Sequence, residues 1–187
     1  MKKLALILLL AIAFLPTARA KELVLPDSCG DNKVQFDIVT EKGKSPLDPP
    51  PAGKALIVLI ETVEKPGMGW LGCPGCNYES RFGMDGAWVG AMKGNAYVAT
   101  PVDPGEHHLC AVIGKKNVGV EAVTAEAGKT YYYEAKYVGV GTRRPGGTSG
   151  QGTYGVDVSV FFTLLSEDEG KYKVKTSERS TSTPKKH

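Results

Sequence analysis

The chain has 187 residues, of which 23 are Lys or Arg and 20 are Asp or Glu, so its net charge is +3 at pH 7. Three of the cations, Lys2, Lys3 and Arg19, lie in an N-terminal segment that we expect to be removed, and the 20 remaining cations then balance the 20 anions. A mature chain of zero net charge has no electrostatic attraction to nucleic acid or to an acidic membrane surface, so we predict neither partner.

Residues 1–20 have the order of a secretory signal peptide. Lys2 and Lys3 precede the apolar run Leu4–Leu15, and Ala18-Arg19-Ala20 places small residues where a signal peptidase cleaves. The apolar run of 12 residues is too short to cross a bilayer as a helix, and no later run is long enough. We therefore predict cleavage after Ala20, a mature chain without a transmembrane segment, and export to the periplasm or the medium.

Four cysteines follow the predicted cleavage point, namely Cys29, Cys73, Cys76 and Cys110. An even number of cysteines in an exported chain predicts disulfides, here two. Four cysteines allow three pairings, and the sequence does not choose among them. If Cys73 pairs with Cys76 across a short loop, Cys29 is left to pair with Cys110.

The first part of the mature chain predicts an irregular lead-in and two strands. Residues 21–32 are polar and form the lead-in, and Lys33–Thr40 alternates apolar and polar side chains like a half-buried strand. Residues 41–53 contain four prolines and form a loop. Lys54–Glu64 is apolar on both faces and rich in β-branched residues, which predicts a central strand covered on both sides.

Two turn signals mark the middle of the chain. Asp85-Gly86 predicts a two-residue hairpin between Glu79–Met84 and Ala87–Val89, because both turn positions require a positive φ. Asp103-Pro104-Gly105 predicts a type II turn that joins Asn95–Val102 and Glu106–Ile113 as a second hairpin.

The last part predicts three strands and two irregular segments. The strands are Gly119–Ala127, Thr130–Val138 and Val156–Leu165. Residues 139–155 contain seven glycines and are predicted to be a flexible loop. Ser166–Glu169 matches a capping box and predicts one short helical turn. Residues 176–187 are rich in Ser, Thr and Lys and are predicted to be a disordered tail.

Seven or eight short strands with little helix predict an all-β fold. We expect residues 33–175 to form one antiparallel β-sandwich with irregular loops rich in Gly and Pro.

Metal and redox chemistry are the first functions to weigh. Cys73-Pro74-Gly75-Cys76 has the spacing of a redox pair, but that chemistry needs a helix N-terminus to lower the thiol pKa, and no helical pattern follows. A zinc site would combine Cys73 and Cys76 with His107 and His108, but the two histidines are adjacent on a strand and therefore point to opposite faces. We predict a structural loop disulfide, no metal and no cofactor, with a thiol–disulfide redox protein as the alternative.

Catalytic and ligand-binding residues are the next question. No nucleophile-elbow pattern surrounds Ser80 or Ser159, so we predict no catalytic residues and no enzyme activity. Trp70, Trp88 and Tyr132 are candidate contacts for a ligand, because aromatic rings stack on sugars and peptides. The expected function is a non-catalytic binding or structural module of the cell envelope, whose partner would be an envelope protein or a polysaccharide.

Five segments in order also carry a family resemblance. They are PAGKALIVLIE (Pro51–Glu61), GMDGAWVGA (Gly83–Ala91), VDPGEHHLCA (Val102–Ala111), TAEAGKTYYYEA (Thr124–Ala135) and LLSEDEGKY (Leu164–Tyr172). Over about Val34–Val174 the chain resembles the bacterial family known as domain of unknown function 2846. The resemblance implies an exported, β-rich envelope domain and no catalytic residues. Some members are lipoproteins, whereas this chain has no cysteine at the predicted cleavage point.

Overall fold

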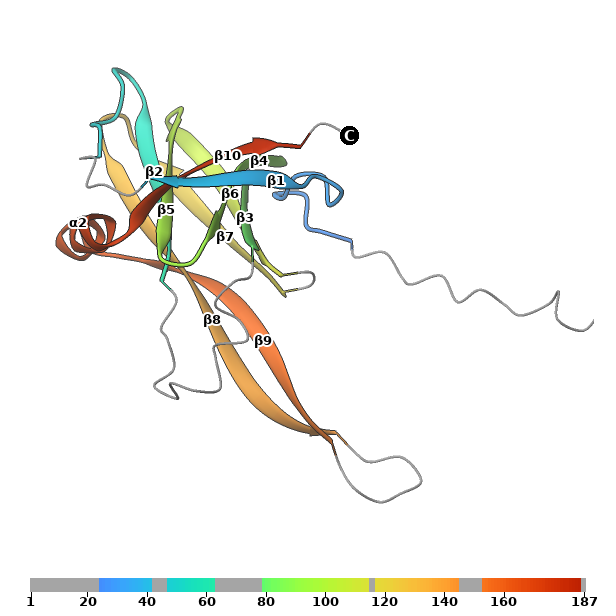
Figure 1. Cartoon of the computed structure of the whole chain (residues 1–187). Helices are drawn as coiled ribbons and strands as arrows, with labels where there is room; N and C mark the ends of the chain where they lie inside the picture. Colours follow the sequence, from blue (N-terminus) through green and yellow to red (C-terminus); the bar gives the residue numbers. More distant parts are fainter. Residues whose placement is uncertain (1–23, 42–46, 63–78, 115–116, 145–152, 186–187) are drawn as a thin grey trace, which may run out of the picture.

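The structure, a computed structural model, describes residues 24–41, 47–62, 79–114, 117–144 and 153–185. Two β-sheets pack face to face in it, and one helix lies outside them (Figure 1). The six-stranded sheet has the order β1 (Phe36–Glu41), β10 (Glu178–Pro184), β5 (Ala96–Val102), β2 (Ala55–Glu61), β8 (Thr130–Arg144) and β9 (Thr153–Leu164). The four-stranded sheet has the order β4 (Ala87–Lys93), β3 (Glu79–Met84), β6 (Gly105–Ile113) and β7 (Asn117–Ala125).

This arrangement confirms the predicted all-β sandwich and refines it. The described chain has ten strands, more than the seven or eight expected. The β2–β8 and β10–β5 pairs are parallel, so the larger sheet is mixed and not purely antiparallel.

β2 lies inside the larger sheet and is buried along its whole length, as its apolar sequence predicts. Its side chains alternate between two hydrophobic layers. Ile57 and Leu59 enter the core between the sheets, where Phe82 and Leu109 of the other sheet meet them. Val58 and Ile60 point to the outer face, where helix α2 (Glu167–Thr176) covers them.

α2 begins where the capping box predicts, but it is longer than the single turn expected. The Ser166 hydroxyl accepts a hydrogen bond from the Glu169 N–H, and the helix continues for ten residues. Gly170 is its one buried residue, and it sits directly on the ring of Tyr132. The glycine therefore allows the helix to approach the sheet rather than ending it.

Replacing Gly170 with alanine tests this close approach. A Cβ at this position would lie 2.1 Å from the Tyr132 ring, so either α2 or the ring must move. We expect Gly170→Ala to lower the free energy of unfolding by about 1–3 kcal/mol, although alanine favours helices. Asp168→Ala, at an exposed position of the same helix, is the control and should be neutral or slightly stabilising. Urea denaturation measures both, and a more stable Gly170→Ala would contradict the packing.

The Asp85-Gly86 hairpin is confirmed, and the second predicted hairpin is wrong. Asp85 and Gly86 have φ of 52° and 86°, and they join β3 to β4. The chain bends at Pro104 without forming the predicted type II turn, and Gly105 already begins β6 with φ of 139°. β5 pairs with β2 and β10 in one sheet, while β6 pairs with β3 and β7 in the other. The connection therefore crosses between sheets instead of closing a hairpin.

The predicted flexible loop at residues 139–155 is strand at both of its ends. β8 and β9 stay paired as far as Arg144 and Thr153, and together they project from the body as a two-stranded arm (Figure 1). Only residues 145–152 of the predicted loop lie outside the described chain. The glycines do not prevent pairing here, because each strand receives its backbone hydrogen bonds from the other.

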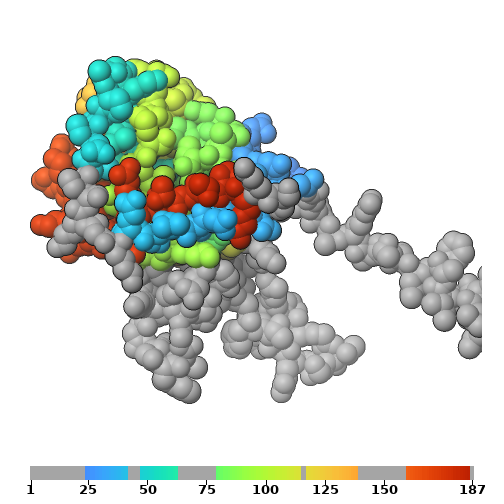
Figure 2. Space-filling model, turned by 45° about the horizontal axis from the view of Figure 1, so that its top comes forward, coloured from blue at the N-terminus to red at the C-terminus, as the bar shows by residue number. Residues whose placement is uncertain are grey.

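The predicted disordered tail at residues 176–187 is also wrong, because residues 178–184 form β10 between β1 and β5. β1 and β10 run side by side across one face of the molecule (Figure 2). The serines of this polar strand bond to the other sheet: Ser182 Oγ accepts from the Ala91 N–H, and Ser180 Oγ donates to the Ala91 carbonyl, both at 2.8 Å.

Candidate functional site

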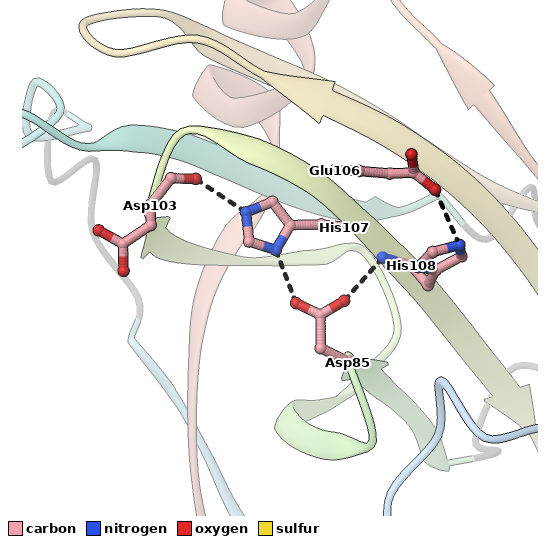
Figure 3. Close-up of polar contacts among 5 residues, drawn as sticks. All are labelled: Asp85, Asp103, Glu106, His107 and His108. Carbon is pink, nitrogen blue, oxygen red and sulfur yellow. Dashed lines mark hydrogen bonds and ion pairs between the residues drawn. The ribbon is translucent and has the colours of Figure 1, made fainter.

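The histidines of β6 form a polar cluster with the β3–β4 turn (Figure 3). Asp85 Oδ2 lies 2.6 Å from His107 Nδ1, and Asp85 Oδ1 accepts from the His108 backbone N–H at 2.8 Å. The other ring nitrogen of His107 lies 2.8 Å from the Asp103 carbonyl oxygen. His108 is exposed and contacts Glu106. The alternation of the strand thus separates the two histidines, as predicted.

The geometry makes the Asp85–His107 pair a structural clamp. Both ring nitrogens of His107 face acceptors, an arrangement that favours the doubly protonated ring. Burial alone would lower the pKa of His107, but the hydrogen bonds to Asp85 and to the Asp103 carbonyl raise it above the ordinary value. A general base needs a free ring nitrogen beside a nucleophile, and His107 has none in this arrangement. The pair joins the β3–β4 turn to the crossing between the sheets.

The Asp85–His107 clamp predicts that the stability of the fold depends on pH and that Asp85→Asn removes this dependence. The raised pKa of His107 stabilises the fold fully below its unfolded value near pH 6.5, and this stabilisation is lost as the pH rises through the folded pKa. Asparagine keeps the turn, because it tolerates positive φ, but it removes the charge. In Asp85→Asn we expect NMR titration to show a lower pKa of His107. The free energy of unfolding at pH 6 should fall by roughly 0.5–1.5 kcal/mol, a modest loss because Asp85 is partly exposed.

Asp168→Asn, which removes an exposed charge on α2, is the control for that experiment. Asp168→Asn should leave the pKa of His107 as it is in the original protein. An unchanged His107 pKa in Asp85→Asn would show that the carboxylate does not hold the imidazolium.

A disulfide joins Cys29 of the lead-in to Cys110 of β6, which confirms one of the pairings considered. Around it the lead-in covers the outer face of the smaller sheet, where Val112, Trp88 and Leu25 pack. Trp88 Nε1 donates to the Asp31 carbonyl, and the Arg81 guanidinium lies 4.8 Å from the centre of its ring. Trp88 is therefore half-buried and packed against the lead-in rather than displayed as a ligand platform.

A second polar cluster lies inside the sandwich, where Glu61 ends β2. Its side chain is 2% exposed, and Tyr137 of β8 donates a hydrogen bond to Glu61 Oε1. Burial raises the pKa of Glu61 to about 7, although hydrogen bonding by Tyr137 and the nearby Ser80 lowers it. Within the described residues neither Ser80 Oγ nor Glu61 Oε2 forms a hydrogen bond of standard geometry. The core near the end of β2 therefore contains two polar atoms, Ser80 Oγ and Glu61 Oε2, that lack a hydrogen-bond partner among the described residues.

A groove of about 770 Å³ opens on the outer face of the larger sheet. Its walls are residues 47–50, the turn at residues 128–130 and one side of α2. In Figure 2 the start of β2 (teal) and α2 (orange-red) lie on the same side of the molecule. Tyr97 of β5 and Tyr132 of β8 line its base and are only 2% and 4% exposed.

The predicted site residues fall in different places. Tyr132 lines the groove, and Trp88 packs under the lead-in on the opposite sheet. Trp70, Cys73 and Cys76 lie outside the described residues. Where the chain is described, no group of three His, Cys, Asp or Glu side chains could hold a metal ion. None of the helices in that part is long and apolar enough to cross a membrane.

Sequence reasoning missed Tyr97 and Glu61. In the sequence, Tyr97 resembles an ordinary core residue of a strand and Glu61 an ordinary residue at the end of a strand. Their surroundings are created by segments that are distant in the sequence. Comparison of the chain with protein-family models, curated proteins and solved structures finds no match. The resemblance to domain of unknown function 2846 therefore stays a prediction.

Proposed function

We propose that the chain is an exported, non-catalytic β-sandwich that serves as a binding or structural module of the bacterial cell envelope. The observation that carries this proposal is the Cys29–Cys110 disulfide, because such bonds persist in oxidising compartments outside the cytoplasm. The leader-like residues 1–20 support the same location.

The polar clusters favour a role without catalysis. His107 is held on both ring nitrogens, and Glu61 is buried between the sheets at 2% exposure, which restricts access to its carboxyl group. The groove beside α2, by contrast, is open and lined by polar and apolar side chains, which suits binding.

Expression of the full chain in a Gram-negative host tests the proposal. We expect the protein in the periplasmic or extracellular fraction, with its N-terminus at Lys21 and with Cys29 linked to Cys110 in the peptide map. The same map reports the state of Cys73 and Cys76. An unprocessed chain in the cytoplasm with free thiols at Cys29 and Cys110 would refute the proposal.

A further inference from the structure

We infer that the groove between α2 and residues 47–50 is a binding site for an uncharged oligosaccharide. This inference rests on the proposed function, since it gives the envelope module a ligand class and a place to hold it. Three observations carry it: the hydroxyls at the base of the groove, the balance of charge around it, and its size and apolar lining.

The base of the groove presents two phenol hydroxyls that lack partners. Tyr97 and Tyr132 are almost completely buried, and neither hydroxyl makes a hydrogen bond within the described residues. Neither hydroxyl is among the polar atoms enclosed without a partner in the described part of the chain, so each is open to the groove and free to bond to water or to a ligand. Burial raises the pKa of both phenols, so each remains neutral and can both donate and accept.

The charges that act on the Tyr132 hydroxyl, those of Lys171 and Glu167, also line the groove, which places this hydroxyl on the groove side. The Tyr97 hydroxyl lies between two environments. Arg179 and Glu41 act on it more strongly than the groove residue Asp48 does, and Tyr97 itself lines the groove.

The charge around the groove favours a ligand without charge. Three lysines and two carboxylates line it, and Lys171 is already paired with Glu167 at 2.5 Å. An anionic ligand would face Asp48 and Glu167, and a cationic ligand would face the lysines. A sugar hydroxyl can accept from an ammonium group and donate to a carboxylate, so a neutral saccharide uses both kinds of group.

The remaining lining fits the apolar faces of sugar rings. Leu47, Pro49, Pro50 and Val174 add rigid or branched apolar surface beside the polar groups. The volume of about 770 Å³ lies inside the range of roughly 300–1,000 Å³ that small-ligand sites occupy.

NMR titration of the mature, disulfide-linked protein tests the inference. The probes are three neutral trisaccharides, built of α-glucose, β-glucose and N-acetylglucosamine, with a galacturonic acid trisaccharide and the peptide Gly-Ser-Gly as comparisons. We expect at least one neutral trisaccharide to shift the backbone amides of Tyr97, Thr130 and Lys171 and to bind more tightly than either comparison ligand.

Variants that lack one tyrosine hydroxyl distinguish binding in the groove from nonspecific binding elsewhere on the protein. Tyr97→Phe and Tyr132→Phe should each weaken the association about two- to tenfold, the loss expected for one hydrogen bond. Both variants should fold, because each loses a hydroxyl without a protein partner. Tyr172→Phe, on α2 but outside the groove lining, is the matched control and should bind like the original protein.

Three results would overturn the inference: no binding of any neutral trisaccharide, stronger binding of the acidic trisaccharide or the peptide, or binding that Tyr97→Phe and Tyr132→Phe leave unchanged. Each can occur in protein that is exported and correctly disulfide-linked, so it would leave the proposed function standing. Loss of export or of the disulfide would instead refute the proposed function.

Discussion

Removal of the Cys29–Cys110 disulfide is expected to lower the free energy of unfolding by roughly 3–5 kcal/mol. The bond joins residues 81 apart in sequence, so it restricts a long loop of the unfolded chain. It also holds the lead-in over the smaller sheet. Among the described residues, the packing of Leu25 and Trp88 and hydrogen bonds such as those from Arg81 to Asn32 and Val34 retain the lead-in as well. The variant Cys29→Ala/Cys110→Ala should therefore lose global stability and expose the face that the lead-in covers.

Urea denaturation with and without a phosphine reductant measures this contribution without mutation. Reduction would also act on Cys73 and Cys76, so the Cys73→Ala/Cys76→Ala variant is the appropriate background. In it, reduction should reproduce the loss seen for Cys29→Ala/Cys110→Ala, and the amide protons of residues 26–34 should exchange faster. A loss below about 1 kcal/mol would mean that the lead-in folds onto the sheet without the bond.

Features that are determined by a few neighbouring residues could be predicted from the sequence. β2 is recognisable because its six consecutive apolar residues, Ala55–Ile60, leave no polar face. The Asp85-Gly86 turn is recognisable because few residues adopt two positive φ values in succession. The cap at Ser166 is likewise local, since its hydroxyl bonds to an N–H three residues later. In each case the physical cause lies within a few neighbouring residues.

Features that depend on distant partners were not predictable. β10 looks like a polar tail, and it is a strand because β1 and β5 pair with it and Ala91 accepts and donates to its serines. Asp103-Pro104-Gly105 does mark a change of chain direction, yet nothing local indicates that the next strand enters the other sheet. The groove likewise combines three segments, around residues 48, 129 and 171, whose proximity exists only in the fold.

Glu61 illustrates the same limit in the core and leads to the second large effect. The end of an apolar strand is an ordinary place for a solvated carboxylate, but β3 and β8 enclose this one. Burial raises its pKa from 4.5 to about 7, against the lowering by Tyr137 and Ser80. Below pH 4.5 the carboxyl is protonated in both states. As the pH rises above 4.5, the unfolded chain loses this proton while the folded protein keeps it. The folded protein is deprotonated only as the pH passes about 7, and by then the stabilisation that protonation gave is lost.

We therefore expect Glu61→Gln to stabilise the protein at alkaline pH. A folded pKa of about 7 against 4.5 unfolded corresponds to a loss of about 3 kcal/mol between pH 4.5 and pH 8.5. Glutamine keeps an acceptor for Tyr137 and adds an N–H₂ donor near Ser80 Oγ, but it has no charge to bury. Urea denaturation should show Glu61→Gln more stable than the original protein by about 2–3 kcal/mol at pH 8.5 and nearly equal to it at about pH 4.

Glu134→Gln is the matched control, because Glu134 is just as buried, at 3% exposure, but faces cations. Burial would raise the pKa of Glu134, yet Lys173 at 2.8 Å and Lys136 at 3.3 Å contribute to lowering it. Its carboxylate therefore stabilises the fold above its unfolded pKa, and Glu134→Gln should destabilise at pH 8.5 by about 1–3 kcal/mol. Two buried glutamates of one sheet thus have opposite effects, because of the two only Glu134 has cationic partners among the described residues. Equal responses of the two variants at pH 8.5 would contradict this account of the core.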